Sequence, residues 1–387
     1  AIGTETAGGG AKGLTAVGHN AGKTDMGENS VAIGNDAASI SQGSESLSIG
    51  LRAGKSNQGS QSISIGFEAG KTSQQNSSIA IGNQAGLTIQ GNVAIAIGFQ
   101  SGFSDQGNNS TAVGAYTAWN NQGDNALALG FKTGSNLQSS FATAIGYQAG
   151  NSNQGSYALA IGSEAGYVSQ GSASTAIGTN AAYSNQGDDA VSVGYNAGKT
   201  VQGDQSVAIG YQSGLSDQKS QATAIGYRSA RQIQGIGSVA VGYQSGEINQ
   251  NTLSTSIGYQ AGQSSQGSQA TSIGYRAGNS LQGVGAVAIG KDAGFSIQNE
   301  GAVSVGESAG YTNQGIGSIA IGGSAGSSFQ AGGAVSIGLR AGNTSQQGGG
   351  VAIGSNAGAI YQKTDSLSIG RRSGMSNQNI NSIAIGT

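Results

Sequence analysis

The sequence contains no cysteine and no proline, and it has few charged or aromatic residues. Without cysteine there can be no disulfide and no thiol chemistry, although this does not fix the compartment. Because only 9% of the residues are charged and 5% aromatic, a compact core built from large side chains is excluded. A proline would remove a backbone donor wherever it stood, so its absence is typical of a chain whose N–H groups take part in continuous hydrogen-bonded ladders.

The charge and the hydropathy of the chain exclude two kinds of partner. The formal net charge is −2 and the lysines and arginines are scattered, so we expect no nucleic-acid binding. No apolar run approaches the ~20 residues that span a bilayer, and no signal peptide is visible. The chain starts at Ala1 inside the repeat pattern. We therefore expect targeting, capping and anchoring segments to lie outside it.

Glycine is abundant, with 72 residues, and one set of glycines sets the period of the whole sequence. A glycine closes an apolar run at every sixteenth position from Gly18 to Gly386, which makes 24 copies. An earlier copy, AIG at residues 1–3, lies one residue closer than the period requires. We therefore predict a single repetitive domain over residues 1–387, with no linker and no visible cap.

The repeat predicts stacked β-structure. Directly before the glycine stands Ile, Val or Leu, preceded by Ala or Ser and then by an aliphatic residue or Thr. This alternation has the period of a strand. Sixteen residues cannot bury enough apolar area to fold alone, so the copies must stack. The fold class that we predict is all-β, a rod-shaped parallel β-solenoid of about 24 coils.

Two columns of the repeat carry structural predictions. Gln stands eight residues after the glycine in every full copy except that of Met26, and we expect an amide ladder through Gln202, Gln218, Gln234, Gln250 and Gln266. If Ile and Val point into the coil, the Ala/Ser column points outward and must be covered. We therefore expect an oligomer interface along Ala208, Ser256 and Ala288.

The run Ser206-Val207-Ala208-Ile209-Gly210 and its copy over residues 318–322 resemble the head repeats of trimeric autotransporter adhesins. That resemblance implies a left-handed parallel β-roll of which three chains form an adhesive head, so a homotrimer is the favoured assembly and a filament the alternative. The likeness covers the first half of each repeat. The second half departs from the family pattern, since it is longer and carries the Gln column. Similar repeats occur in phage and giant-virus fibre proteins.

Nothing in the sequence favours catalysis, a metal or a cofactor, and we expect no enzyme. The single histidine, His19, lies in a predicted turn, and Asp and Glu occupy no recurring column. A calcium-binding roll needs such carboxylates at every turn. The GGG runs at residues 8–10 and 348–350 lack the following Lys and Ser or Thr of a phosphate loop.

The variable positions after the glycine carry the candidate ligand-binding site. Six consecutive coils place a tyrosine there, with amide or guanidinium neighbours, a combination that suits sugar faces; a corner ladder held by ring contacts is the structural alternative. The candidate residues are Tyr195, Tyr211, Tyr227, Tyr243, Tyr259, Tyr275, Arg228 and Arg276.

These observations predict a segment of an extracellular, cell-surface or virion-surface fibre that attaches to a receptor or glycan. One alternative is a structural filament or spacer without a ligand. Another is an ice-binding solenoid, because Ser or Thr recurs six residues after the glycine. The threonines on which that alternative depends include Thr72, Thr88, Thr200 and Thr312, and the column is interrupted at Ile40, Val168, Gln232 and Ile248.

Overall fold

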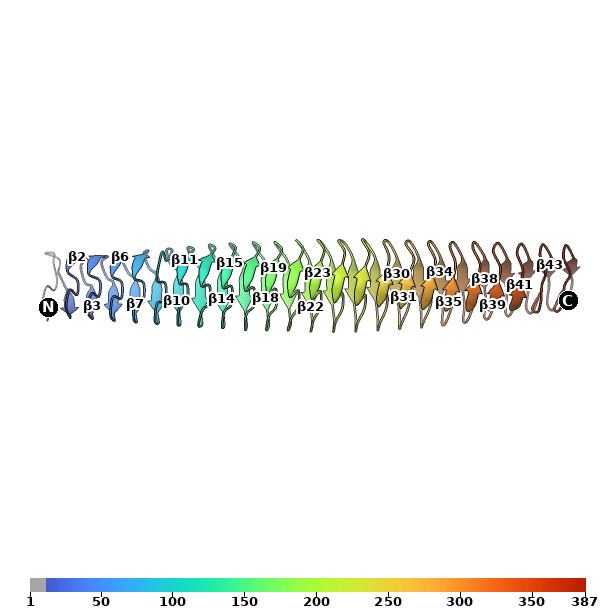
Figure 1. The fold of residues 1–387 in the computed structure, drawn as a ribbon, viewed down its shortest axis with the longest axis horizontal. Coiled ribbons are helices and arrows are strands. Elements are labelled where there is room, and N and C mark those ends of the chain that lie inside the picture. Colours follow the sequence, from blue (N-terminus) through green and yellow to red (C-terminus); the bar gives the residue numbers. More distant parts are fainter. Residues whose placement is uncertain (1–11) are drawn as a thin grey trace. The chain divides into compact units, whose positions relative to one another are not determined.

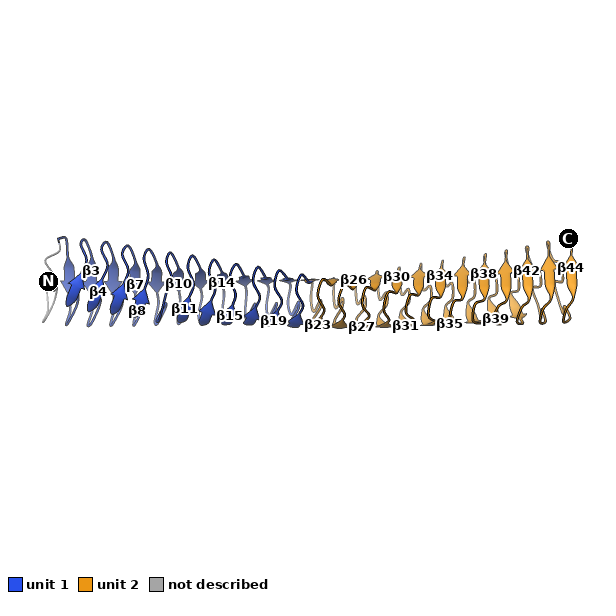
Figure 2. Ribbon diagram, turned by 90° about the horizontal axis from the view of Figure 1, so that it is seen from above, with its two compact units in different colours: residues 1–190 blue, residues 191–387 orange. Residues whose placement is uncertain are grey.

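The computed structural model describes residues 12–387, which form two compact units, one ending at Ala190 and one spanning Val191–Thr387 (Figure 2). The described residues contain strands and no helix. The predicted all-β parallel solenoid with a sixteen-residue turn is confirmed within each unit. The short first copy at residues 1–3 lies outside the described residues, and one continuous solenoid over residues 1–387 stays a prediction.

Each coil contributes two short strands to two parallel sheets. In unit 2, β24 (Val207–Ile209) pairs with β26 (Thr223–Ile225) so that Ala208 lies opposite Ala224. The next strand of the coil, β25 (Ser216–Gln218), pairs with β27 (Gln232–Gln234). Because the register equals the repeat, equivalent residues stack along each unit, as successive coils in Figure 1 show. We call the two sheets the Ala/Ser sheet and the Gln sheet.

The strands of unit 1 follow this pattern. Those of its Ala/Ser sheet are β1 (Thr15–Val17), β3 (Val31–Ile33), β5 (Leu47–Ile49), β7 (Ile63–Ile65), β9 (Ile79–Ile81), β10 (Ile95–Ile97), β12 (Thr111–Val113), β14 (Leu127–Leu129), β16 (Thr143–Ile145), β18 (Leu159–Ile161) and β20 (Thr175–Ile177). Those of its Gln sheet are β2 (Thr24–Met26), β4 (Ile40–Gln42), β6 (Ser56–Gln58), β8 (Thr72–Gln74), β11 (Ser104–Gln106), β13 (Asn120–Gln122), β15 (Asn136–Gln138), β17 (Ser152–Gln154), β19 (Val168–Gln170) and β21 (Ser184–Gln186). Between β8 and β11 only isolated bridges at Gln90 continue the Gln sheet.

Unit 2 repeats the arrangement. Besides β24 and β26, its Ala/Ser sheet contains β22 (Val191–Val193), β28 (Val239–Val241), β30 (Thr255–Ile257), β32 (Thr271–Ile273), β34 (Val287–Ile289), β36 (Val303–Val305), β38 (Ile319–Ile321), β40 (Val335–Ile337), β42 (Val351–Ile353), β43 (Leu367–Ile369) and β44 (Ile383–Ile385). Besides β25 and β27, its Gln sheet contains β23 (Thr200–Gln202), β29 (Ile248–Gln250), β31 (Ser264–Gln266), β33 (Ser280–Gln282), β35 (Ser296–Gln298), β37 (Thr312–Gln314), β39 (Ser328–Gln330) and β41 (Thr344–Gln346).

The core of each coil is lined by small residues, which reverses the orientation expected for the Ala/Ser sheet. Ala208 is fully buried, whereas Ile209 beside it is 37% exposed. The interior of a sixteen-residue coil holds alanine, serine, glycine and the glutamine side chains, and this leaves no room for an isoleucine. The large aliphatic side chains therefore point outward, and the prediction that Ile209 faces inward is wrong.

The glycine that closes each apolar run is required twice over. Gly210 has φ of +126°, a conformation that residues with a Cβ rarely adopt. A Cβ on Gly210 would also collide with the carbonyl oxygen of Gly226 in the next coil. Any side chain here would force the stacked coils apart.

Candidate functional site

The predicted Gln ladder is present as a chain of buried amides. Nε2 of Gln202 donates to Oε1 of Gln218 at 3.1 Å, and Nε2 of Gln218 donates to Oε1 of Gln234 at 2.9 Å. The bonds continue from Gln234 to Gln250 and from Gln250 to Gln266. These side chains are almost fully buried. A ligand cannot reach them, so the ladder acts on the fold.

Each Gln also bonds across its own coil, and serine on the Ala/Ser sheet adds to this. Nε2 of Gln218 donates to the carbonyl oxygens of Val207 and Ala222, at 2.9 and 3.3 Å. Where the Ala/Ser column carries serine, as at Ser192, its Oγ donates to Oε1 of the Gln ten residues later, at 2.6 Å. At Met26, which has no amide to donate, the ladder is interrupted, and Oε1 of Gln42 in the next coil has no partner.

The six tyrosines of the candidate site form a continuous stack, the Tyr ribbon, running from Tyr195 to Tyr275. Successive ring centroids lie 4.9–5.3 Å apart and the planes differ by 4–12°. Each ring is about two-fifths exposed. Because the faces pack on one another, ring edges and hydroxyl groups are what the ribbon presents to solvent. A sugar cannot stack on the faces between neighbouring rings.

The two candidate arginines beside the Tyr ribbon are paired with carboxylates. Nη2 of Arg228 lies 2.9 Å from Oε1 of Glu247, which also contacts Arg231. Nε of Arg276 donates to Asp292 at 2.7 Å, and its guanidinium lies over the rings of Tyr275 and Phe295. These pairs lower the net positive charge available to an anionic ligand. Glu247 and Asp292 occupy no recurring acidic column, so the repeat pattern did not single them out.

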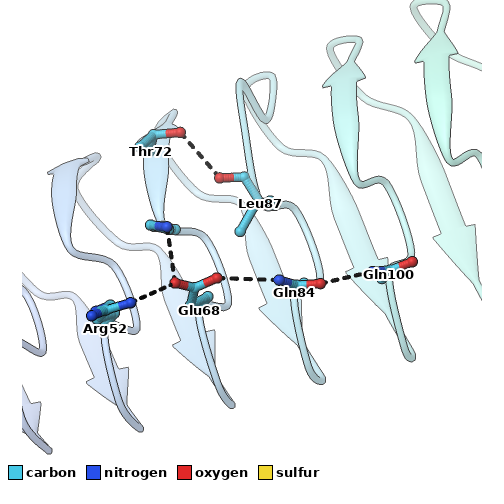
Figure 3. A network of polar contacts seen from close by, with 7 residues as sticks. Arg52, Glu68, Thr72, Gln84, Leu87 and Gln100 are labelled. Carbon is cyan, nitrogen blue, oxygen red and sulfur yellow. Dashed lines mark hydrogen bonds and ion pairs between the residues drawn. The ribbon is translucent and has the colours of Figure 1, made fainter.

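A second polar ladder runs along unit 1, two residues after the glycine (Figure 3). Glu68 accepts from Arg52 at 3.1 Å, from Lys71 at 2.9 Å and from Gln84 at 3.2 Å. Gln100 continues the ladder by donating to Gln84. The bond from Lys71, aided by those from Gln84 and Arg52, lowers the pKa of Glu68 to about 2 against the opposing effect of burial. This network stabilises the stack of coils.

The outer face of the Ala/Ser sheet carries two rows of large aliphatic side chains. In β24 these are Val207, which is half-buried, and Ile209, which is exposed. The same two positions are aliphatic, or Thr in the first row, in every coil. Contiguous exposed apolar surface of this kind is typical of sites that bind another protein, a membrane or a ligand. We call this surface the aliphatic face.

The three residues expected to form an oligomer interface do not lie on a surface. Ala208, Ser256 and Ala288 are each fully buried inside their own coil. The small residues of this column are required because the interior is narrow, and no second chain is needed to cover them. The expectation was wrong because it assigned the two faces of the strand in reverse.

The histidine and the threonines singled out in the sequence show no arrangement typical of a catalytic or metal site. His19 is exposed. The hydroxyl groups of Thr72, Thr88, Thr200 and Thr312 donate to backbone carbonyls of the next coil, at 3.1–3.5 Å (Thr72 in Figure 3). Residues 12–387 contain no cluster of three or more His, Asp or Glu that could hold a metal ion. Their coils also lack any helix with the length and apolar character needed to cross a membrane.

Comparison with known proteins identifies two segments. The family model of the YadA head domain repeat matches residues 27–51 and 186–213. These segments include β3 to β5 and β22 to β24, so both contain the apolar run, its closing glycine and the following Gln-sheet strand. Comparison with curated proteins finds no match. The chain therefore carries two YadA head domain repeats in a parallel β-solenoid, as its resemblance to the head repeats of trimeric autotransporter adhesins predicts.

Proposed function

We propose that this chain is the structural and adhesive segment of a fibre on a cell or virion surface, with no enzymatic role. The YadA head repeats suggest an adhesin-like surface fibre segment. The solenoid supports this role because each coil holds its neighbours through two sheets and a buried amide ladder. Such a scaffold presents equivalent side chains at a regular spacing of ~4.8 Å.

The observation that carries the proposal is the aliphatic face. In unit 2 the outer row includes Ile209, Ile225, Ile257, Ile273 and Ile289, each 37–39% exposed. A polar fibre exposed to water has no reason to keep such a row, whereas association of several copies would bury it. We therefore propose that the chain forms a homo-oligomer through this face, and the resemblance to the adhesin heads favours a trimer.

Light scattering on an outer-row variant tests this assembly. Replacing Ile209, Ile225 and Ile257 together by Lys should give monomers with an unchanged far-ultraviolet circular dichroism spectrum, because the side chains lie outside the core. The matched control replaces the exposed Ile233, Leu281 and Ile297 on the Gln sheet by Lys and should assemble like the parent. A monomeric parent, or an outer-row variant that assembles normally, would contradict the proposal.

The Tyr ribbon is the proposed contact for a cell-surface receptor or glycan, through its hydroxyl groups and ring edges. Replacing Tyr227, Tyr243 and Tyr259 by Phe removes three hydroxyl groups and keeps the stack. Replacing the same residues by Ser removes ring contacts worth ~0.5–1.5 kcal/mol each. Adhesion should fall in both variants, and only the Ser variant should melt earlier. Full adhesion by both variants would contradict this contact. It would show that the Tyr ribbon only stabilises the stack, as expected for a structural spacer without a ligand.

Ice binding has little support from the geometry. The threonines that motivated it use their hydroxyl groups to bond the next coil, and they are half-buried. A hydroxyl that already donates within the protein has less freedom to order water. A thermal-hysteresis assay on the parent should show no activity.

A further inference from the structure

An open groove runs along unit 1 beside the Gln sheet. Its four overlapping stretches have cavity volumes of about 370–490 Å³ and together reach from Asp25 to Asp188. Gln75 belongs to the first two stretches along the chain, Asp105 to the second and third, and Leu137 to the third and fourth. The groove is therefore continuous over successive coils. It is open to solvent along its length, which suits a linear polymer better than an enclosed small molecule.

One wall of the groove is built by the middle residues of the Gln-sheet strands from β2 to β17. Asn57, Asn121 and Asn153 lie there with φ of +53° to +55°, a conformation that asparagine tolerates better than most residues. Their side chains are exposed. Within residues 12–387 no protein group bonds their side-chain amides. Donors and acceptors are thus free at this wall.

The opposite wall is held in place by the stack. It is formed by residues two positions after the glutamines, such as Asn92, Asn108 and Ser172. Oδ1 of Asn108 accepts from the backbone N–H of Asn92 at 2.9 Å, and Oδ1 of Asp188 accepts from that of Ser172 at 2.7 Å. Such bonds fix the wall before any ligand arrives, which lowers the entropic cost of binding.

The lining chemistry identifies the class of ligand. Amide and hydroxyl side chains predominate, Ile89 and Leu137 add apolar contacts, and the charged lining residues are the carboxylates Asp25, Asp105 and Asp188. No lysine or arginine lines the four stretches. This surface would repel an anionic polymer and can exchange hydrogen bonds with the hydroxyl groups of a neutral one.

We propose that this groove binds a neutral polysaccharide chain lengthwise. Coils ~4.8 Å apart present side chains at equivalent positions in turn, polar in most coils and apolar at Ile89 and Leu137, whereas an extended polypeptide advances by ~3.3 Å per residue and would fall out of register. A pyranose ring of an extended glycan advances by a distance close to one coil, so successive rings meet the same positions of successive coils.

This site is separate from the assembly proposed above. None of its lining residues belongs to the Ala/Ser sheet, so oligomers formed through the aliphatic face would leave it open. Loss of assembly and loss of polysaccharide binding are therefore distinguishable. Light scattering reports the first and affinity measurements report the second.

The test uses a lysine placed in the groove at a position where the repeat already accepts one. Ser139 follows Gln138 directly and lines two stretches of the groove, and the equivalent position is Lys219 in unit 2. Ser139→Lys should therefore fold normally and obstruct the groove. The matched control is Asn299→Lys, at the same repeat position in unit 2. A milder variant, Asn121→Gly, keeps the backbone conformation and removes one free amide.

Titration calorimetry with cellulose and chitin oligosaccharides of increasing length, and with heparin, gives the readout. We expect the parent to bind neutral oligosaccharides more tightly as they lengthen, and to bind heparin poorly. Ser139→Lys should lose roughly tenfold in affinity, about 1.4 kcal/mol, Asn121→Gly should lose less, and Asn299→Lys should match the parent. No binding of the neutral oligosaccharides, equal binding by Ser139→Lys, or a preference for heparin would overturn the proposal.

Discussion

Inside each coil, the hydroxyl oxygen of a serine in the Ala/Ser column decides whether the residue facing it can be alanine or must be glycine. Four residues after the closing glycine stands a second glycine, such as Gly198 or Gly214. A Cβ on either glycine would lie 2.8–2.9 Å from Oε1 of the Gln four residues later. On Gly198 it would also collide with Oγ of Ser192, whereas on Gly214 it would lie 3.2 Å from Cβ of Ala208. The coils that carry alanine at this position have alanine opposite as well, with Ala38, Ala118, Ala182 and Ala230 accompanying Ala32, Ala112, Ala176 and Ala224.

We therefore predict that Gly198→Ala destabilises the chain more than Gly214→Ala does. The difference should be ~1–3 kcal/mol, as for an overpacked core. Adding Ser192→Ala to Gly198→Ala should recover most of the loss, which a double-mutant cycle in urea would measure. Equal costs for the two glycines, or no recovery in the double variant, would show that the hydroxyl does not set the choice.

Glu68 gives a pH-dependent prediction at the same scale. Its pKa is about 2 in the folded chain and ~4.3 when unfolded, so folding favours the ionised form. Its contribution is complete above the unfolded pKa and is lost as the pH falls from about 4.5 to about 2. Glu68→Gln should lower the melting temperature at pH 7, and the gap to the parent should close at pH 2. A gap independent of pH would exclude this ionic contribution.

At the scale of the strand, the sequence predicts that the two faces differ and does not say which is inside. Alternation of large and small residues identified the Ala/Ser strands and their sixteen-residue register. The orientation depends on the width of the coil. Because each coil consists of two three-residue strands and their turns, its interior is too narrow for the side chain of Ile209. The Gln column was predictable because each buried amide needs hydrogen-bond partners in the coils above and below, so Gln recurs at the same position of the repeat. The pairing of Arg228 with Glu247 follows no column of the repeat.

The amide ladder yields the prediction at this scale. Gln218→Leu removes one acceptor of Gln202 and the donor to Oε1 of Gln234, and it removes the side-chain hydrogen bonds to the carbonyls of Val207 and Ala222. Since a buried hydrogen bond contributes ~1 kcal/mol and a buried acceptor left without a donor costs ~1–3 kcal/mol, the variant should lose roughly 2 kcal/mol or more. Gln221→Leu, at an exposed glutamine of the same coil, is the control and should change stability little. Ligand binding should be unchanged in both variants, and the opposite pattern would make Gln218 a ligand contact.

At the scale of the whole molecule, different surfaces of the coil carry different side chains and suit different roles. We propose that the aliphatic face joins copies of the chain and that the Tyr ribbon and the groove of unit 1 remain for ligands. The assembly and the ligands could not be predicted from the repeat alone. The sequence placed the interface at Ala208 because it assigned the two faces of the strand in reverse, whereas the structure places the exposed apolar row at Ile209. The groove is formed by residues of several stacked coils, so no single repeat predicts it.

Small residues of the Ala/Ser sheet point inward and large ones outward, and thiol labelling can check this orientation in solution. Because the chain has no cysteine, single substitutions give unique labels, and labelling follows exposure. In dilute folded protein, Ile209→Cys should react with a maleimide at a rate approaching that of the exposed reference Asn153→Cys, and Ala208→Cys should react only after unfolding. Rapid labelling at position 208 together with protection at position 209 would contradict this orientation of the strand.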